Sequence, residues 1–189
     1  MSDPSALTLK QNLLRVIRHD RPQWVPNGME SVARAVEQIV QSGEWEQLAD
    51  FVHPEFGLTV SIDGQFGELC DPVFAREAIP YLIGSPTLFV WGLVPDGENL
   101  DLRTFTDALS VFSVGDLRGG RKVSVHNANS RDHRLSLAGQ FKSPYYVSYH
   151  KPGTGEHARF EWSQINVVFD QHTDGEWYLV ALGLAYWSI

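Results

Sequence analysis

Hydrophobic residues near the start of the chain recur at helical spacing. In LTLKQNLLRVIRHD, residues 7–20, they fall every three or four positions, and Thr8 is suited to cap such a helix. Pro22 and Pro26 end this pattern and predict an extended connector. Residues 1–28 are therefore expected to form an N-terminal helical arm with its connector.

Residues 30–51 carry the clearest helical pattern of the chain. An apolar stripe runs to Val40, is interrupted at Ser42-Gly43 and restarts at Trp45. A proline at position 54 disfavours the helical conformation for His53 and ends the pattern there. We expect two helices in tandem.

From residue 57 onward the pattern changes to strands and turns. GLTVSIDG alternates apolar and polar residues and closes on Asp63-Gly64, which favours a hairpin. Residues 72–83 predict a short helix, 87–93 a buried strand, and 102–114 a helix capped by Thr104 or Thr106. Four strands are expected within residues 121–128, 144–151, 157–171 and 176–189. This order predicts an α+β fold, with N-terminal helices packed on a curved, mainly antiparallel sheet in one domain of residues 29–189.

The last strand, WYLVALGLAYWSI, is almost continuously apolar. A strand with one solvated face alternates between apolar and polar residues, whereas a strand buried on both faces does not. We therefore expect residues 177–189 to form a central strand that is paired on both sides.

Composition and charge narrow the classes of function. A formal net charge of −8 argues against nucleic acid and anionic membranes as partners, because both are bound by clustered Lys and Arg. The chain has no apolar segment long enough for a membrane span, no secretory signal and one cysteine, so we expect a cytoplasmic protein. No metal-ligand spacing or nucleotide-binding motif occurs, and neither a metal nor a cofactor is expected.

Two stretches resemble known groups of proteins. NLLR and RPQWVPNG, within residues 8–28, resemble the N-terminus of uroporphyrinogen-decarboxylase-like proteins. Residues 45–189 resemble an uncharacterised group of bacterial domains that end in a pattern like DWxSLRLVF, an Asp-Gly turn and WYLVGIIHDxWTI. The matching residues here include Trp162, Ser163, Asp174, Gly175 and Trp187. Where that group has His-Asp before the last tryptophan this chain has Leu184-Ala185, which weakens the expectation of acid–base chemistry there.

The helix pair followed by a strand meander also resembles the cone-shaped fold of nuclear transport factor 2 (NTF2-like) and of SnoaL-like polyketide cyclases. That resemblance implies a pocket enclosed between the helices and the concave face of the sheet. Fold resemblance does not by itself transmit a function.

Three histidines and a tyrosine are the candidate catalytic residues. His53 could act as a general base oriented by Glu55 or Asp50, or it could cap the preceding helix. His126, His150 and Tyr146 lie on predicted neighbouring strands, where they converge on a pocket or lie on a solvated outer face.

The candidate ligand-binding residues are mostly aromatic or amide side chains. Trp162, Gln164 and Asn166 share one face of a predicted strand, where they line a pocket or simply pack on the sheet. Trp91, expected under the Asp96-Gly97 turn, and Tyr149 complete the set.

These observations lead to two alternative functions. The first is a domain without a cofactor that binds a small apolar or aromatic ligand or associates with itself as a homodimer, since aromatic side chains suit both pockets and interfaces. The second is a cofactor-free isomerase, cyclase or hydratase of the SnoaL-like type, with a pocket histidine as general base.

Overall fold

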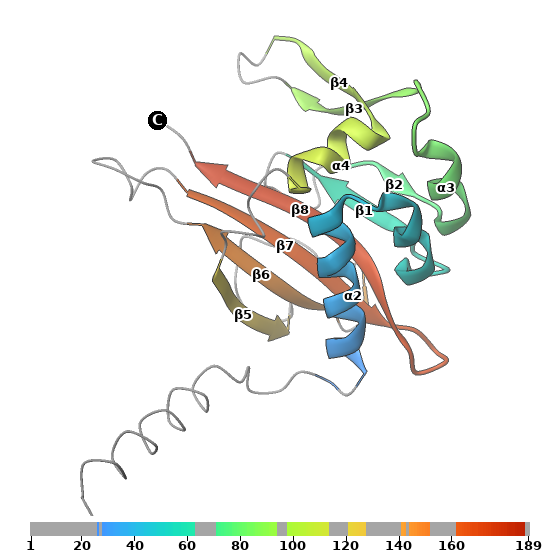
Figure 1. The fold of residues 1–189 in the computed structure, drawn as a ribbon, viewed down its shortest axis with the longest axis vertical. Helices are drawn as coiled ribbons and strands as arrows, with labels where there is room; N and C mark the ends of the chain where they lie inside the picture. Colours follow the sequence, from blue (N-terminus) through green and yellow to red (C-terminus); the bar gives the residue numbers. More distant parts are fainter. Residues whose placement is uncertain are drawn as a thin grey trace, which may run out of the picture.

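The computed structural model describes residues 26, 28–62, 71–93, 98–113, 121–127, 141–142, 144–151 and 162–187, with the backbone alone for residues 113, 121–127, 162 and 186–187. It shows a curved sheet with a helix lying across one face and a two-stranded ribbon to one side (Figure 1). The fold class is α+β, as predicted from the sequence. The expected N-terminal arm lies outside the described residues, apart from Pro26 and Gly28.

Helix α2 (Met29–Ser42) covers one face of the sheet. Its buried residues are Met29, Ala33, Val36, Ile39 and Val40, which follow the helical period and belong to the main core. The helix ends at Gly43, whose φ of 74° is left-handed and whose N–H donates to the Ile39 carbonyl over 2.8 Å. The chain continues as the 3-10 helix η1 (Trp45–Phe51), so the predicted tandem pair is present, with a 3-10 helix as its second member.

Within the part of the chain that the structure describes, six strands form the main sheet in the order β2-β1-β8-β7-β6-β5. Their bounds are β1 (Leu58–Ser61), β2 (Val73–Phe74), β5 (Arg121–Asn127), β6 (Tyr145–Lys151), β7 (Trp162–Gln171) and β8 (Trp177–Trp187). The strands β5 to β8 form the expected antiparallel meander.

Strand β8 is central, as its apolar run predicted. It pairs with β7 on one side and with β1 on the other, where Val60 lies opposite Leu182. The β1–β8 pairing is parallel, which the sequence pattern did not indicate. Both faces of β8 are buried over residues 179–183, which accounts for the lack of alternation in this strand.

The two faces of the sheet differ in chemistry. Val147, Ile165 and Leu182 point toward α2 and join its apolar stripe in the main core. Ser148 and Asn166 alternate with these residues and lie on the opposite face, where both are buried. The space between the helix and the sheet is thus occupied by packed side chains.

The second sheet is a ribbon of β3 (Leu88–Leu93) and β4 (Leu100–Thr104). Helix α4 (Phe105–Ser113) follows directly, and Thr104 caps it by accepting the Asp107 N–H over 3.1 Å. The helix therefore begins three residues later than predicted. The strand predicted for residues 87–93 is present as β3, but only one of its faces is buried, because Leu88, Val90 and Leu93 are exposed.

Residues 72–83 combine three short elements instead of one helix. They are β2, the 3-10 helix η2 (Arg76–Ala78) and α3 (Ile79–Leu82). The described part of the chain contains no helix with the length and apolar character that crossing a membrane requires.

Candidate functional site

The outer face of the β3–β4 ribbon is apolar and open to solvent. Val90 pairs with Leu102 and Leu93 with Leu100, so these four side chains share one face, and Leu88 lies on it two residues before Val90. The register shifts between Val90 and Leu93 at Gly92, whose φ is 118°, and this bulge returns Leu93 to the same face. We call this set the ribbon face: Leu88, Val90, Leu93, Leu100 and Leu102, each between 41% and 59% exposed.

The inner face of the ribbon is held against the body of the protein. Phe74 of β2 packs on Phe89 and Trp91, with ring centroids 5.1 and 5.8 Å apart. The Trp91 Nε1–H donates to the Arg103 carbonyl over 3.0 Å and joins the two strands. The ribbon face is thereby fixed toward solvent. Trp91 is buried by this packing, and the Asp96-Gly97 turn expected above it lies outside the described residues.

His53 is buried at the connection between η1 and β1. Its side chain is 1% exposed and stacks on Phe56, with ring centroids 4.4 Å apart. The backbone N–H groups of Glu55 and Phe56 both donate to His53 Nδ1, each over 3.1 Å. Since a backbone N–H is always a donor, Nδ1 is unprotonated and the ring is neutral. His53 therefore caps the turn that follows it, not the carbonyls of the preceding helix.

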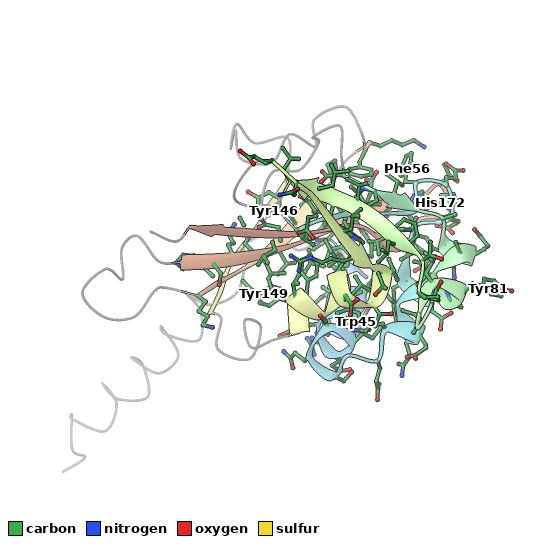
Figure 2. All side chains as sticks on the ribbon, turned by 90° about the horizontal axis from the view of Figure 1, so that it is seen from above. Trp45, Phe56, Tyr81, Tyr146, Tyr149 and His172 are labelled. Atoms are coloured by element: carbon green, nitrogen blue, oxygen red, sulfur yellow. The ribbon has the colours of Figure 1, made fainter. Side chains whose placement is uncertain are left out.

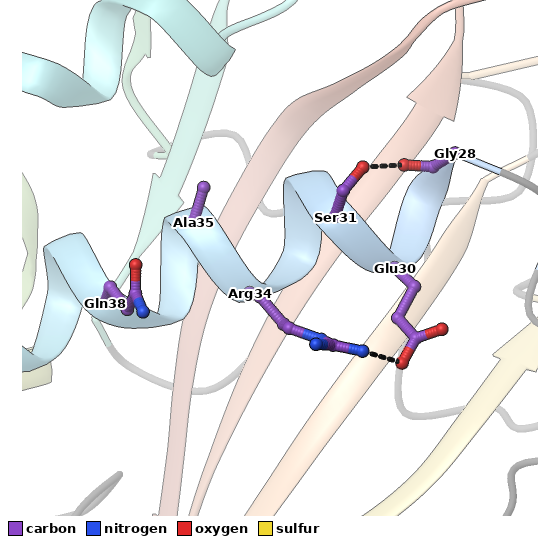
Figure 3. A pocket seen from close by; sticks show the side chains of 6 residues that line it. All are labelled: Gly28, Glu30, Ser31, Arg34, Ala35 and Gln38. Atoms are coloured by element: carbon purple, nitrogen blue, oxygen red, sulfur yellow. Dashed lines mark hydrogen bonds and ion pairs between the residues drawn. The ribbon is translucent and has the colours of Figure 1, made fainter.

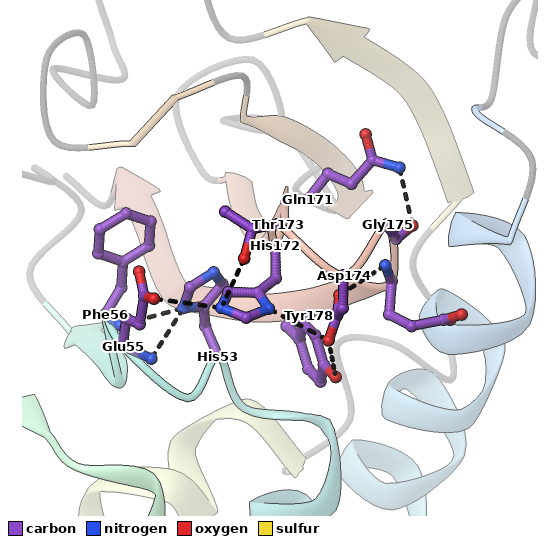
Figure 4. Close-up of polar contacts among 10 residues, drawn as sticks. His53, Glu55, Phe56, Gln171, His172, Thr173, Asp174, Gly175 and Tyr178 are labelled. Atoms are coloured by element: carbon purple, nitrogen blue, oxygen red, sulfur yellow. Dashed lines mark hydrogen bonds and ion pairs between the residues drawn. The ribbon is translucent and has the colours of Figure 1, made fainter.

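A second histidine, His172, lies beside His53 in the turn between β7 and β8 (Figure 4). The two ring centroids are 5.1 Å apart and the rings meet edge to face. Glu55 reaches His172, with 3.3 Å between Oε1 and Nε2, and so does not orient His53. Asp174 Oδ2 lies 3.1 Å from His172 Nδ1, at ion-pair distance but without hydrogen-bond alignment, and accepts the Tyr178 hydroxyl over 3.1 Å.

The two histidines differ in their affinity for a proton. Burial lowers the pKa of His53 below its ordinary value, and the neighbouring His172 lowers it further, against the opposing effect of Asp170 and Glu55. Asp174 raises the pKa of His172, in spite of some desolvation, and Glu55 adds to the increase. His172 is thus the first of the pair to accept a proton as the pH falls.

Of the other candidate catalytic residues, Tyr146 and His150 lie on the sheet face opposite α2. The register places His126 opposite Tyr146, and His150 at the other end of β6 opposite Gln164. Only the backbone of His126 is described. Tyr146 belongs to a small apolar cluster against which Phe56 packs. His53 and Tyr146 are therefore near the same phenylalanine, while His150 lies farther along the sheet.

The candidate ligand-binding residues are divided between the two sides of the sheet. Gln164 and Asn166 lie on the face opposite α2, where Asn166 Oδ1 accepts from Ser148 Oγ over 2.6 Å and from Gln164 Nε2 over 2.8 Å. Tyr149 lies under α2 and donates to Glu37 Oε2 over 3.2 Å. Figure 2 shows Tyr146 and Tyr149 on opposite sides of the strands. For Trp162 only the backbone is described.

Burial raises the pKa of Tyr149, and the nearby Glu37 raises it further. This phenol is therefore a hydrogen-bond donor that holds α2 to the sheet and is unsuited to lose its proton. Its environment is that of a packing residue.

An open recess of about 490 Å³ runs along the solvent side of α2 (Figure 3). Glu30 and Arg34 form an ion pair there between exposed side chains. Across the described residues, no three His, Cys, Asp or Glu side chains are grouped so as to hold a metal ion. The residues that line the recess are Gly28, Glu30, Ser31, Arg34, Ala35 and Gln38.

Sequence reasoning missed both the ribbon face and His172. Strand β3 is apolar on both faces, so periodicity alone could not separate its exposed side chains from its buried ones. Strand β4 does alternate, with Leu100 and Leu102 on one face and Asp101 and Arg103 on the other, but the pattern of residues 102–114 favoured a helix.

His172 stands two residues before Asp174, and the Asp174-Gly175 pair predicts a turn. That pattern cannot show that His172 lies next to His53, which is distant in the sequence. No known protein family matches the chain, and no curated protein sequence matches it significantly.

Proposed function

We propose that this protein is a self-associating domain whose contact surface is the ribbon face. The observation that carries the proposal is the exposure of five aliphatic side chains on one side of a projecting ribbon. Contiguous apolar patches of this kind on a soluble domain mark interaction sites. A second copy of the same chain is the partner that fits best.

The aliphatic character of the ribbon face favours a second copy. A surface of uncharged aliphatic side chains can pack against its own copy, so two copies related by a two-fold axis can stack their ribbons face to face. From the exposed fractions, complete burial of two ribbon faces would remove at most roughly 1,000 Å² from water, which is the lower limit for a specific contact. The paired ribbons would then form a small apolar core between the copies.

The charge distribution is consistent with the same partner. The chain carries a net charge of −8, so two copies repel each other at long range. The ribbon face itself contributes no charge, and on the inner side Arg103 is neutralised by Asp101, with 2.8 Å between Nε and Oδ1. Contact through the ribbon therefore avoids placing like charges directly against each other.

The packing under α2 makes self-association better supported than ligand binding in a pocket between the helix and the sheet. Val36 and Ile39 of the helix share one apolar cluster with Ile165, Val167 and Leu182 of the sheet. A ligand between these layers would have to displace close-packed side chains. Stacking of the ribbons requires no such rearrangement.

Sedimentation equilibrium over a range of protein concentrations tests the proposal. The wild type is expected to show a reversible monomer–dimer equilibrium. In the double variant Val90→Thr/Leu102→Thr the cross-strand pair at the centre of the ribbon face becomes polar, while threonine keeps a strand preference. We expect its dissociation constant to rise about tenfold or more, with little change in thermal unfolding of the monomer.

The matched control is Tyr81→Thr. Tyr81 is 83% exposed on α3 and, in Figure 2, points outward at the edge of the molecule, away from the ribbon. This variant is expected to associate like the wild type. A wild type that is monomeric at every concentration, or a double variant that associates as tightly as the control, would contradict the proposal.

A further inference from the structure

The neutral His53 ring holds a turn that touches the base of the ribbon. Its Nδ1 accepts the N–H groups of Glu55 and Phe56, and the His53 carbonyl accepts the Gly57 N–H over 3.0 Å. The His53 N–H donates to the Leu179 carbonyl of β8 over 2.9 Å, which fixes the turn to the central strand. A protonated imidazole has no free lone pair on Nδ1, so protonation breaks two of these bonds.

Gly57 connects this turn to β2. A Cβ atom at Gly57 would lie 2.4 Å from the Phe74 carbonyl oxygen, so the two backbones are in direct contact. The next residue, Leu58, pairs with Phe74 in the sheet. A displacement of the turn is therefore transmitted to Phe74 without an intervening flexible side chain.

Phe74 is the residue on which the ribbon rests. Its ring packs against Phe89 and Trp91 of the ribbon and against Phe105, where α4 begins. The ribbon has no strand partner in the main sheet among the described residues, so this aromatic contact is a principal support for it. The orientation of the ribbon face depends on the position of Phe74.

The charged groups around His53 come from several elements. Glu55 belongs to the turn itself, His172 to the β7–β8 turn, Asp170 to β7, and Lys142 to the segment before β6. The carboxylates of Asp170 and Glu55 favour protonation of His53, whereas His172 and Lys142 oppose it. His172 is itself held between Glu55 and Asp174, so its positive charge forms first and delays that of His53.

We propose that protonation of His53 releases the turn at residues 54–57 and, through Gly57 and Phe74, loosens the ribbon and weakens self-association. This inference rests on the proposed function. It gives the contact surface a proton-dependent control in which His53 is the switch and His172 sets the pH at which it acts.

The experiment measures the dimer dissociation constant of the full chain at about pH 7.5 and about pH 5, the lower value lying well below the ordinary pKa of histidine because the pKa of His53 is lowered. We expect the wild type to dissociate about tenfold more readily at the lower pH. The variant His53→Asn keeps an acceptor for the two N–H groups but cannot titrate, so its dissociation constant should stay nearly the same at both values.

A second variant, His172→Gln, tests the role of the neighbour. Without the positive charge of His172, His53 accepts a proton more easily, so the pH midpoint of dissociation should move upward. This readout also serves if His53→Asn does not fold. Amide hydrogen exchange at Glu55 and Phe56 provides a local measurement, and we expect their protection to fall with pH together with association.

The outcomes separate the two proposals. A dimer whose dissociation constant is the same at both pH values overturns the proton control and leaves self-association standing. A wild type that is monomeric at about pH 7.5 overturns both proposals. Equal pH responses in the wild type and His53→Asn, or an unchanged midpoint in His172→Gln, would overturn the assignment of the switch to His53.

Discussion

At the residue scale, the structure contains two neighbouring histidines whose surroundings favour opposite protonation states. His53 is needed as a hydrogen-bond acceptor and is stable in the fold only as a neutral ring. His172 lies between two carboxylates and is stabilised as a cation. The rings lie next to each other, and the positive charge of His172 makes the protonation of His53 less favourable.

The effect of each histidine on stability has its own sign. His172 has a raised pKa, so its contribution is fully present below its unfolded-state value of 6.5 and is lost as the pH rises through the folded-state pKa. His53 has a lowered pKa, so its contribution is present above 6.5 and is lost as the pH falls through the folded-state pKa. A moderate decrease in pH therefore strengthens the ion pairs of His172 and weakens the hydrogen bonds that His53 accepts.

Replacing Asp174 by asparagine should bring the titration of His172 closer to that of His53. The variant Asp174→Asn removes the carboxylate whose direct contact contributes most to the raised pKa of His172, while an amide oxygen can still accept the Glu176 N–H. We expect the pKa of His172 to fall toward 6.5 in titrations of the histidine ring protons by NMR. The loss of stability relative to wild type should be greatest below about pH 6.5 and should fade at higher pH. An unchanged His172 titration would contradict the assigned contact, and Asp107→Asn, on the distant α4, is the control.

At the element scale, the sequence predicted those helices and strands whose pattern can be recognised within a single segment. The stripe ending at Val40 and the break at Gly43 predicted α2 and its end, and the apolar run of residues 177–189 predicted a central strand. The partner of β8 on its second side could not be predicted, because parallel pairing with β1 depends on where the chain returns in space. The ribbon face was not predicted either, since both faces of β3 are apolar and residues 102–114, which include part of β4, were expected to form a helix.

Leu182 allows the central position of β8 to be tested. It is fully buried, lies opposite Val60 and Val167, and joins the core under α2. Because the surrounding strands cannot close around the space, Leu182→Ala should lower the free energy of unfolding by about 2–5 kcal/mol in denaturant titrations. The control Val73→Ala shortens an exposed side chain on an edge strand and should change it by less than about 0.5 kcal/mol. Similar losses for the two variants would be inconsistent with a central β8.

At the scale of the whole molecule, the candidate sites depend on the assembled fold. His53 and His172 meet because β8 pairs with β1 and the turn before β8 folds beside the turn before β1. The sequence identified His53 as a candidate but could supply neither its neighbour nor the backbone contacts that fix its protonation state. Alternation along the strand predicted that Gln164 and Asn166 share one face. Only the strand register showed that Ser148 lies opposite Asn166 and donates a hydrogen bond to it.

The net charge of the molecule also sets how self-association should respond to salt. Two copies with a charge of −8 repel each other, whereas the ribbon face that joins them has no ion pairs to lose. Raising the salt concentration from about 0.02 M to about 0.3 M screens the repulsion and leaves the apolar contact intact, so the dissociation constant should decrease. Sedimentation equilibrium at neutral pH measures this, and Val90→Thr/Leu102→Thr should remain largely monomeric throughout. Dissociation of the wild type on adding salt would instead indicate a contact made by charged side chains and would contradict the ribbon face as the interface.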